Sequence, residues 1–111
     1  MRRTLGATGP AVPPLGMGGA WVQAIPDAQA LDAVDAAWDA GTRYYDTAPW
    51  YGKGLSEQRM GLALHTRPRK DYTLSTKVGR FLRPVSPEAH EEHGWPNNSL
   101  LNNVRSTANF Y

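Results

Sequence analysis

The sequence contains no cysteine among its 111 residues, so neither a disulfide framework nor a thiolate metal site can form. No apolar segment of the kind found in a secretory signal follows the N-terminal "MRRTLGATGP". No apolar run approaches the length that spans a bilayer. These absences predict a cytoplasmic protein with no membrane association.

Strong charge of one sign is also lacking, because twelve cations face ten anions for a net charge of +2. Cations gather between Arg67 and Arg83. Such a stretch could bind an anionic ligand, but a solvated loop is the commoner explanation, so we rank an anion-binding domain lowest. Aromatic residues do not interleave with these cations, and we expect no nucleic-acid partner. A hydrophobic content of 41% is enough for one modest core.

Glycine and proline divide the chain into short segments, of which "IPDAQALDAVDAAWDAG" carries the strongest helix signals. Apolar residues recur at helical spacing on one side and aspartates lie on the other: Leu31, Val34 and Trp38 against Asp32, Asp35 and Asp39. Asp27 is the expected N-cap after Pro26, and Gly41 is expected to end the helix. The pattern predicts a helix between these two residues.

The other segments predict strands and a second helix. "RTLGATG" and "AVPPLGMGG" are typical of short extended pieces with a turn between them, and "TRYYDT" and "YTLSTKVG" of strands. A helix is expected from about Ser56, whose hydroxyl would cap it, to about Thr66. Strand, helix, strand, helix, strand with short connections favours right-handed βαβ units and a parallel α/β sheet.

The predicted elements are too few for a complete fold of this class. A (β/α)₈ barrel needs about 250 residues, whereas only two full βα units and a third strand are visible here. Residues 85–111 show no clear periodicity and are predicted to be a long loop or disordered tail. Within them, His90 and His93 lack further ligands, so we expect no metal site.

Three chemically useful side chains are expected at one edge of the sheet. Ligands of parallel α/β proteins lie beyond the carboxyl ends of the strands. Asp46 is at such an end, Tyr51 is on the loop after it, and Lys77 closes the third strand, on the same face as Thr73 and Ser75. Each alone has an ordinary structural explanation, as a turn residue, a loop anchor or a solvated cation. Their placement at one rim is what favours a shared function.

The chemistry that these residue types suit is carbonyl reduction. It builds negative charge on an oxygen, which must be stabilised and then protonated. A phenol, with an ordinary pKa of about 10, needs a nearby cation to become a useful acid. A carboxylate could hold that cation in place.

Longer motifs resemble the aldo-keto reductase family over residues 2 to about 84. "GTRYYDTAPWYGKGLSEQRMG" is similar to the first signature of that family, "LSTKVG" to its lysine strand, and "PPLGMGGAW" to its first barrel strand. The resemblance is closest to the bacterial branch that oxidises or reduces sugars and related small aldehydes and alcohols. It implies that residues 1–84 are the N-terminal part of a (β/α)₈ TIM barrel, with about three βα units and a short hairpin capping the base.

The resemblance also implies a function. It would be the interconversion of aldehydes or ketones, including sugars, with alcohols, dependent on NADP or NAD. The catalytic residues would be Tyr51 as acid/base, Lys77 as the cation that makes it more acidic, and Asp46 as the partner of Lys77. The nicotinamide end of the cofactor would lie against Gly18, Gly19, Ala20 and Asp46. The cofactor itself would carry the hydride.

Two features depart from the family pattern. The histidine that ends the family's next strand has no counterpart, since His65 falls on the second predicted helix. The later segments that bind the cofactor's pyrophosphate and adenosine phosphate are also missing. We therefore expect a fragment that is inactive alone. The alternative is a non-catalytic, truncated protein that associates through the exposed edge of its sheet.

Overall fold

The computed structural model of the chain describes residues 2–79, 82–84 and 104–106. The elements of the N-terminal part are β1 (Arg3–Thr4), β2 (Ala11–Val12), β3 (Met17–Gly18), α1 (Asp27–Asp39), β4 (Tyr44–Asp46), α2 (Leu55–Leu64), a 3₁₀ turn (Arg69–Asp71) and β5 (Thr73–Ser75). Two further strands follow, β6 (Leu82–Pro84) and β7 (Val104–Ser106), which pair antiparallel. Among the described residues no helix is both long and apolar enough to cross a bilayer.

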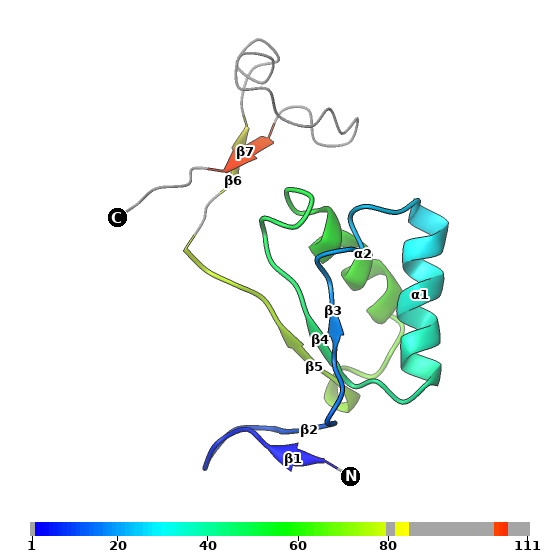
Figure 1. Cartoon of the computed structure of the whole chain (residues 1–111), viewed down its shortest axis with the longest axis vertical. Coiled ribbons are helices and arrows are strands. Elements are labelled where there is room, and N and C mark those ends of the chain that lie inside the picture. The colour runs from blue at the N-terminus through cyan, green and yellow to red at the C-terminus, as the bar shows by residue number, and fades with distance from the viewer. Residues whose placement is uncertain (1, 80–81, 85–103, 107–111) are drawn as a thin grey trace.

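A parallel three-stranded sheet in the order β3-β4-β5 organises the N-terminal part. Both helices lie on one side of this sheet (Figure 1). The core between them contains Met17 and Tyr45 from the strands, Val34 from α1, and Met60 and Leu64 from α2. The predicted strand–helix order and parallel sheet are therefore confirmed.

Strand alternation separates this packed face from an open one. Gly18 is in register with Asp46, and Asp46 with Ser75, so these three residues share one face of the sheet. Their neighbours Met17 and Tyr45 share the other face and are buried against the helices. The face that carries Asp46 is thus turned away from both helices.

The N-terminal hairpin was also predicted. β1 pairs antiparallel with β2, with Arg3 opposite Val12 and Thr4 opposite Ala11. In Figure 1 this hairpin lies at the end of the sheet where the parallel strands begin; Asp46 is the last residue of β4 and so belongs to the other end.

Helix α1 ends as the sequence predicted. Gly41 has a φ of +94°, a left-handed conformation that glycine adopts without steric cost. Its N–H donates to the Trp38 carbonyl at 2.9 Å, and the N–H of Thr42 donates to the Ala37 carbonyl at 2.9 Å. This is a Schellman motif, which satisfies carbonyls that the end of a helix leaves free.

Two predicted helix caps were wrong. Pro26, not Asp27, occupies the N-cap position of α1, and no side chain caps that end; the carboxylate of Asp27 binds the guanidinium of Arg59 instead. Helix α2 begins at Leu55 after Gly54, which has a φ of +98°. The hydroxyl of Ser56 does not cap α2 but turns inward to the carbonyl of Gly19. In both cases a partner distant in sequence competes for the polar side chain.

Other boundaries differ by a few residues. Helix α2 ends at Leu64, before the predicted Thr66. The third parallel strand covers Thr73–Ser75, whereas the sequence suggested residues 72–79. Within the expected tail, residues 85–111, the structure describes only the short strand β7, and the rest of that segment lies outside the described residues.

Arg59 connects α2 to the loop between β3 and α1. Its side chain is 8% exposed, and its guanidinium donates to the carbonyl of Ile25 at 2.9 Å and to the carboxylate of Asp27 at 2.9 Å. It also donates to the carbonyl of Val22. A buried cation is tolerated only when such partners replace its water. Arg59 therefore holds the loop that follows β3.

We expect Arg59→Met to lower the free energy of unfolding by about 3 kcal/mol, because two carbonyls and a carboxylate lose their donor. Urea denaturation followed by circular dichroism measures this loss. Lys70→Met, at an exposed position, is the matched control and should stay within about 0.5 kcal/mol of the wild type. Equal stability of the two variants would contradict the assigned role of Arg59.

Candidate active site

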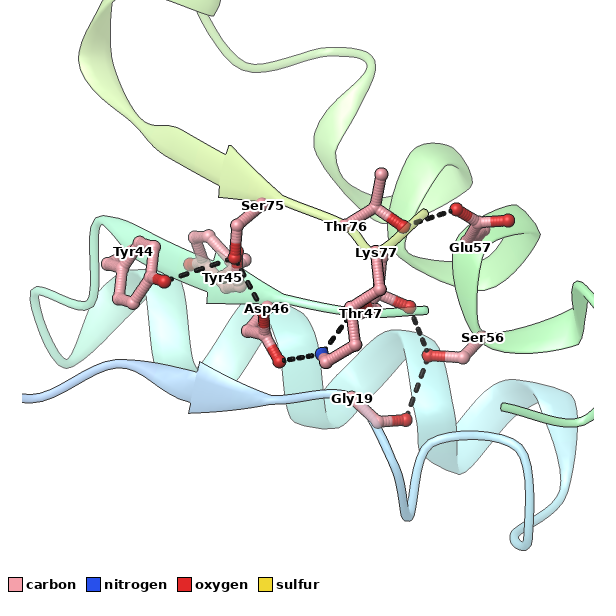
Figure 2. A network of polar contacts seen from close by, with 10 residues as sticks. All are labelled: Gly19, Tyr44, Tyr45, Asp46, Thr47, Ser56, Glu57, Ser75, Thr76 and Lys77. Atoms are coloured by element: carbon pink, nitrogen blue, oxygen red, sulfur yellow. Dashed lines mark hydrogen bonds and ion pairs between the residues drawn. The ribbon is translucent and has the colours of Figure 1, made fainter. Parts of the chain in front are cut away.

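Asp46 ends β4 and is the centre of a polar cluster on the open face (Figure 2). One carboxylate oxygen, Oδ1, accepts a hydrogen bond from Ser75 Oγ at 2.6 Å. The other, Oδ2, lies 2.6 Å from the ammonium of Lys77. β4 and β5 are paired in parallel with Asp46 opposite Ser75, so Lys77, two residues further, comes back to the same face.

Lys77 joins the carboxylate to the loop that follows β4. Its Nζ donates to Asp46 and also to the carbonyl of Thr47 at 3.0 Å. The ring of Tyr51 lies beside it, with 5.0 Å from Nζ to the ring centroid, a cation–π distance. The structure thus brings Asp46, Tyr51 and Lys77 together at the carboxyl end of the sheet, as the sequence predicted.

Asp46 and Lys77 each favour the charged form of the other. The hydrogen bond from Lys77, followed by that from Ser75, lowers the pKa of Asp46 below its ordinary 3.8. The carboxylate of Asp46, with smaller effects of Tyr51, raises the pKa of Lys77 above 10.5. Both side chains are solvent-accessible, Lys77 at 49% and Asp46 at 36%, and exposed ion pairs add little stability. The pair is consequently better suited to holding an ammonium beside a phenol than to stabilising the fold.

The first turn of α2 connects the ends of all three parallel strands. Ser56 is fully buried; its hydroxyl donates to the carbonyl of Gly19 at 2.8 Å, just after β3, and lies 2.9 Å from Thr47 Oγ1, just after β4. The adjacent Glu57 accepts a hydrogen bond from Thr76 Oγ1 at 2.6 Å, just after β5. Figure 2 shows these contacts around the strand ends. We call Ser56 and Glu57, with these contacts, the α2 clasp.

The residues predicted to contact a nicotinamide occupy different environments. A Cβ built on Gly18 would meet no atom within 4 Å, so the backbone beside Asp46 faces open space. A Cβ on Gly19 would lie 2.7 Å from Ser56 Oγ and 2.8 Å from the carbonyl of Asp46, so this glycine is required by close packing against α2. Ala20 is exposed next to them. Gly18 leaves room for a flat ring to approach the backbone, which fits a nicotinamide.

Two contacts of the cluster were missed at the level of sequence. The hydroxyl of Tyr44 lies 3.1 Å from Ser75 Oγ, and Thr76 binds Glu57. Tyr44 precedes Asp46 by two residues, so its position on the same face could have been read from strand alternation. The contact of Thr76 could not, because it depends on how α2 packs against the end of β5.

Neither histidine prediction changes this site. His65 is exposed at the C-terminal end of α2, where its Nδ1 lies 2.6 Å from the carbonyl of Leu62. His90 and His93 lie outside the described residues. Within the described ranges no group of three or more His, Asp or Glu side chains is placed to hold a metal ion.

Comparison with known proteins shows the family to which the chain is similar. The model of the Aldo/keto reductase family matches residues 14–108. The chain is 55% identical over 86 residues to D-threo-aldose 1-dehydrogenase of Pseudomonas sp., which covers 74% of this chain and 26% of that protein. It is 37% identical over 109 residues to pyridoxal 4-dehydrogenase of Microbacterium luteolum, covering 86% and 32%.

A solved structure gives the same result for the fold. An aldo-keto reductase from Bacillus halodurans superposes with a TM-score of 0.65 at 38% identity, over 71% of this chain and 26% of that chain. The predicted resemblance, with its bacterial sugar-dehydrogenase-like branch, and the predicted partial (β/α)₈ barrel are confirmed. The chain spans about a quarter to a third of the length of these curated relatives.

We expect Ser56→Ala to lower the free energy of unfolding by about 2 kcal/mol, because the buried carbonyl of Gly19 loses its donor. Thr47→Val should destabilise through the same cluster, and the double variant should lose less than the sum of the two, since the residues share one hydrogen bond. Urea denaturation measures all three. Thr66→Ala, at an exposed position, is the control; strict additivity of Ser56→Ala and Thr47→Val would argue against a shared network.

The charged pair predicts a pH dependence with a defined sign. The Asp46 contribution is present above its unfolded pKa of 3.8 and is lost as the pH falls through the lower folded value. The Lys77 contribution is present below 10.5 and is lost as the pH rises through the higher folded value. Lys77→Met should therefore raise the pKa of Asp46, which ¹³C NMR titration of its carboxyl carbon measures. Lys70→Met should leave that titration unchanged, and an unshifted Asp46 in Lys77→Met would disprove the pairing.

Proposed function

Since this chain belongs to the aldo/keto reductase family, we propose that it forms the first part of an oxidoreductase that interconverts carbonyl compounds and alcohols with NADP or NAD. The observation that carries the proposal is the contact of Asp46 with Lys77 beside the ring of Tyr51, at the carboxyl end of the parallel strands. Ligands of such sheets lie at this end.

Tyr51 is the proton donor in the proposed reduction. As negative charge develops on the carbonyl oxygen, the phenol of Tyr51 transfers its proton to that oxygen and leaves a phenolate. The ammonium of Lys77 lies beside the ring and stabilises the phenolate by its charge. Asp46 and the carbonyl of Thr47 hold the ammonium there. In the reverse direction the phenolate accepts the proton of the alcohol.

A bound nicotinamide would supply or accept the hydride at the carbon atom. The backbone at Gly18, open beside Asp46, and the exposed Ala20 would form the floor under its ring. Gly19 would keep this stretch of backbone in place, because its N–H donates to the Asp46 carbonyl at 2.7 Å and its own carbonyl accepts a hydrogen bond from Ser56.

The proposed substrates are small aldehydes and sugars. Two relatives are named D-threo-aldose 1-dehydrogenase and pyridoxal 4-dehydrogenase, and a third, from Arabidopsis thaliana, is named L-galactose dehydrogenase. Each of these names is that of a dehydrogenase of a sugar or of pyridoxal, which is an aldehyde. They favour the oxidoreductase over the alternative of a non-catalytic chain that associates through the edge of its sheet.

We further propose that the 111-residue chain is inactive alone. The side chains of Lys77 and Asp46 are 49% and 36% exposed, so the face that carries Asp46 is open to water. An unenclosed site weakens every electrostatic interaction on which the proton transfer depends. Purified chain mixed with NADPH and a reactive aldehyde should show no sustained oxidation of NADPH.

A chimera tests the proposed function. Residues 2–79 would replace the matching segment of the Pseudomonas D-threo-aldose 1-dehydrogenase, and the chimera should oxidise an aldose with a nicotinamide cofactor. Tyr51→Phe and Lys77→Met should each lower kcat by about 100-fold or more, since they remove the acid/base and its cation. Tyr72→Phe, a matched tyrosine change on the helix side of the sheet, is the control. A folded, cofactor-binding chimera whose kcat is unaffected by Tyr51→Phe would refute the proposal.

A further inference from the structure

We propose that Tyr44 and Ser75 are positioning residues for the Asp46–Lys77 pair. Together they form a chain of two hydroxyl groups that ends on Asp46, which we call the hydroxyl chain. The inference deepens the proposed function and rests on it in one respect, namely that Lys77 serves Tyr51; the geometry of the hydroxyl chain itself does not depend on any substrate or cofactor.

The hydroxyl chain approaches the carboxylate from the side opposite Lys77 (Figure 2). The phenolic oxygen of Tyr44 lies 3.1 Å from Ser75 Oγ, which in turn lies 2.6 Å from Asp46 Oδ1. Lys77 occupies the second oxygen, Oδ2, at 2.6 Å. Each carboxylate oxygen therefore has its own charged or hydroxyl donor.

Proton counting fixes the direction of the hydroxyl chain. Asp46 carries no proton at neutral pH, since Lys77 and Ser75 hold its pKa below 3.8, so it can only accept. Ser75 has a single hydroxyl proton, and Asp46 at 2.6 Å takes it in preference to the Tyr45 carbonyl at 3.5 Å. Ser75 Oγ then accepts from Tyr44, whose phenol must be the donor. All the hydroxyl dipoles point toward the carboxylate, and hydrogen bonds in such a series strengthen one another.

This direction has a consequence for Lys77. A carboxylate held at Oδ1 by a hydrogen bond to a strand residue cannot rotate freely about its terminal bond, so Oδ2 stays directed at Nζ. The ammonium is then fixed by two acceptors, Asp46 Oδ2 and the carbonyl of Thr47 at 3.0 Å. Those two contacts place the charge beside the ring of Tyr51. Without Ser75, the carboxylate could turn and leave Lys77 to solvent.

Tyr44 is itself held in place by packing. It belongs to β4 two residues before Asp46 and therefore shares the open face. Its ring lies directly against Gly16, where an added Cβ would come within 2.6 Å of the Tyr44 Cδ1 atom. The absence of a side chain at Gly16 thus provides the space that the Tyr44 ring occupies when its hydroxyl reaches Ser75.

The test is an NMR titration of the 111-residue chain without cofactor or substrate. It follows the Asp46 carboxyl carbon and the Lys77 side chain in the wild type, Ser75→Ala, Ser75→Thr and Tyr44→Phe. We expect the pKa of Asp46 to rise in Ser75→Ala, and to rise less in Tyr44→Phe, which removes only the far end of the hydroxyl chain. Ser75→Thr retains the hydroxyl and should restore the wild-type value. The pKa of Lys77 should fall toward 10.5 in Ser75→Ala, because the carboxylate no longer points at it.

Thr73→Val is the matched control, since it removes a hydroxyl from the same face of the same strand. It should leave both titrations unchanged. The inference is overturned if Asp46 titrates as in the wild type in Ser75→Ala, if Lys77 keeps its raised pKa there, or if Thr73→Val shifts Asp46 as much. If Ser75→Ala does not fold, Tyr44→Phe provides the test: a raised pKa of Asp46 supports the inference, and an unchanged pKa overturns it. The titration needs no cofactor or substrate and the chimera measures kcat, so a negative titration result would not contradict the proposed function.

Discussion

The buried hydroxyl of Ser56 is the contact on which the geometry of the rim depends. It lies where no water can replace a partner, so its proton must go to a protein acceptor, and the carbonyl of Gly19 provides one at 2.8 Å. Since that proton is used, Thr47 must donate its own to Ser56 Oγ at 2.9 Å. One hydroxyl thereby fixes the ends of β3 and β4 relative to α2. The adjacent Glu57 does the same for β5 through Thr76.

The α2 clasp and the Asp46–Lys77 pair have different roles. The buried clasp makes the strand ends rigid, and the exposed pair supplies charge. The clasp is neutral at its buried centre, and a buried hydrogen bond that is fully satisfied makes a unique arrangement rigid. The ion pair is half-exposed and adds little to stability; in the proposed reaction its ammonium would act on the phenol of Tyr51. The first turn of α2 contacts Thr47, which follows Asp46, and Thr76, which precedes Lys77. By fixing these two neighbours it determines where the charged pair lies.

The parts of this structure that could be predicted from sequence are those determined by nearby residues. Helical spacing and Gly41 located α1, and strand alternation placed Lys77 on the face of Asp46, because both signals act within a few residues along the chain. Asp27 and Ser56 were misassigned as helix caps because each sits at the correct local position for one. Their actual partners, Arg59 and Gly19, are 32 and 37 residues away, and no local pattern predicts a contact with a buried guanidinium or with a carbonyl just after β3.

The open face of the sheet leaves the proposed catalytic residues in contact with water. Lys77 already contacts both Asp46 and the ring of Tyr51, so closing a barrel around these residues need not rearrange them. What enclosure changes is the medium, since a cation at a given distance from a developing anion acts several times more strongly when water is excluded. The side chain of Lys77 is 49% exposed, so water still screens its charge in the three-stranded sheet. In the proposed oxidoreductase, enclosure would therefore strengthen the effect of Lys77 on Tyr51 without moving either residue.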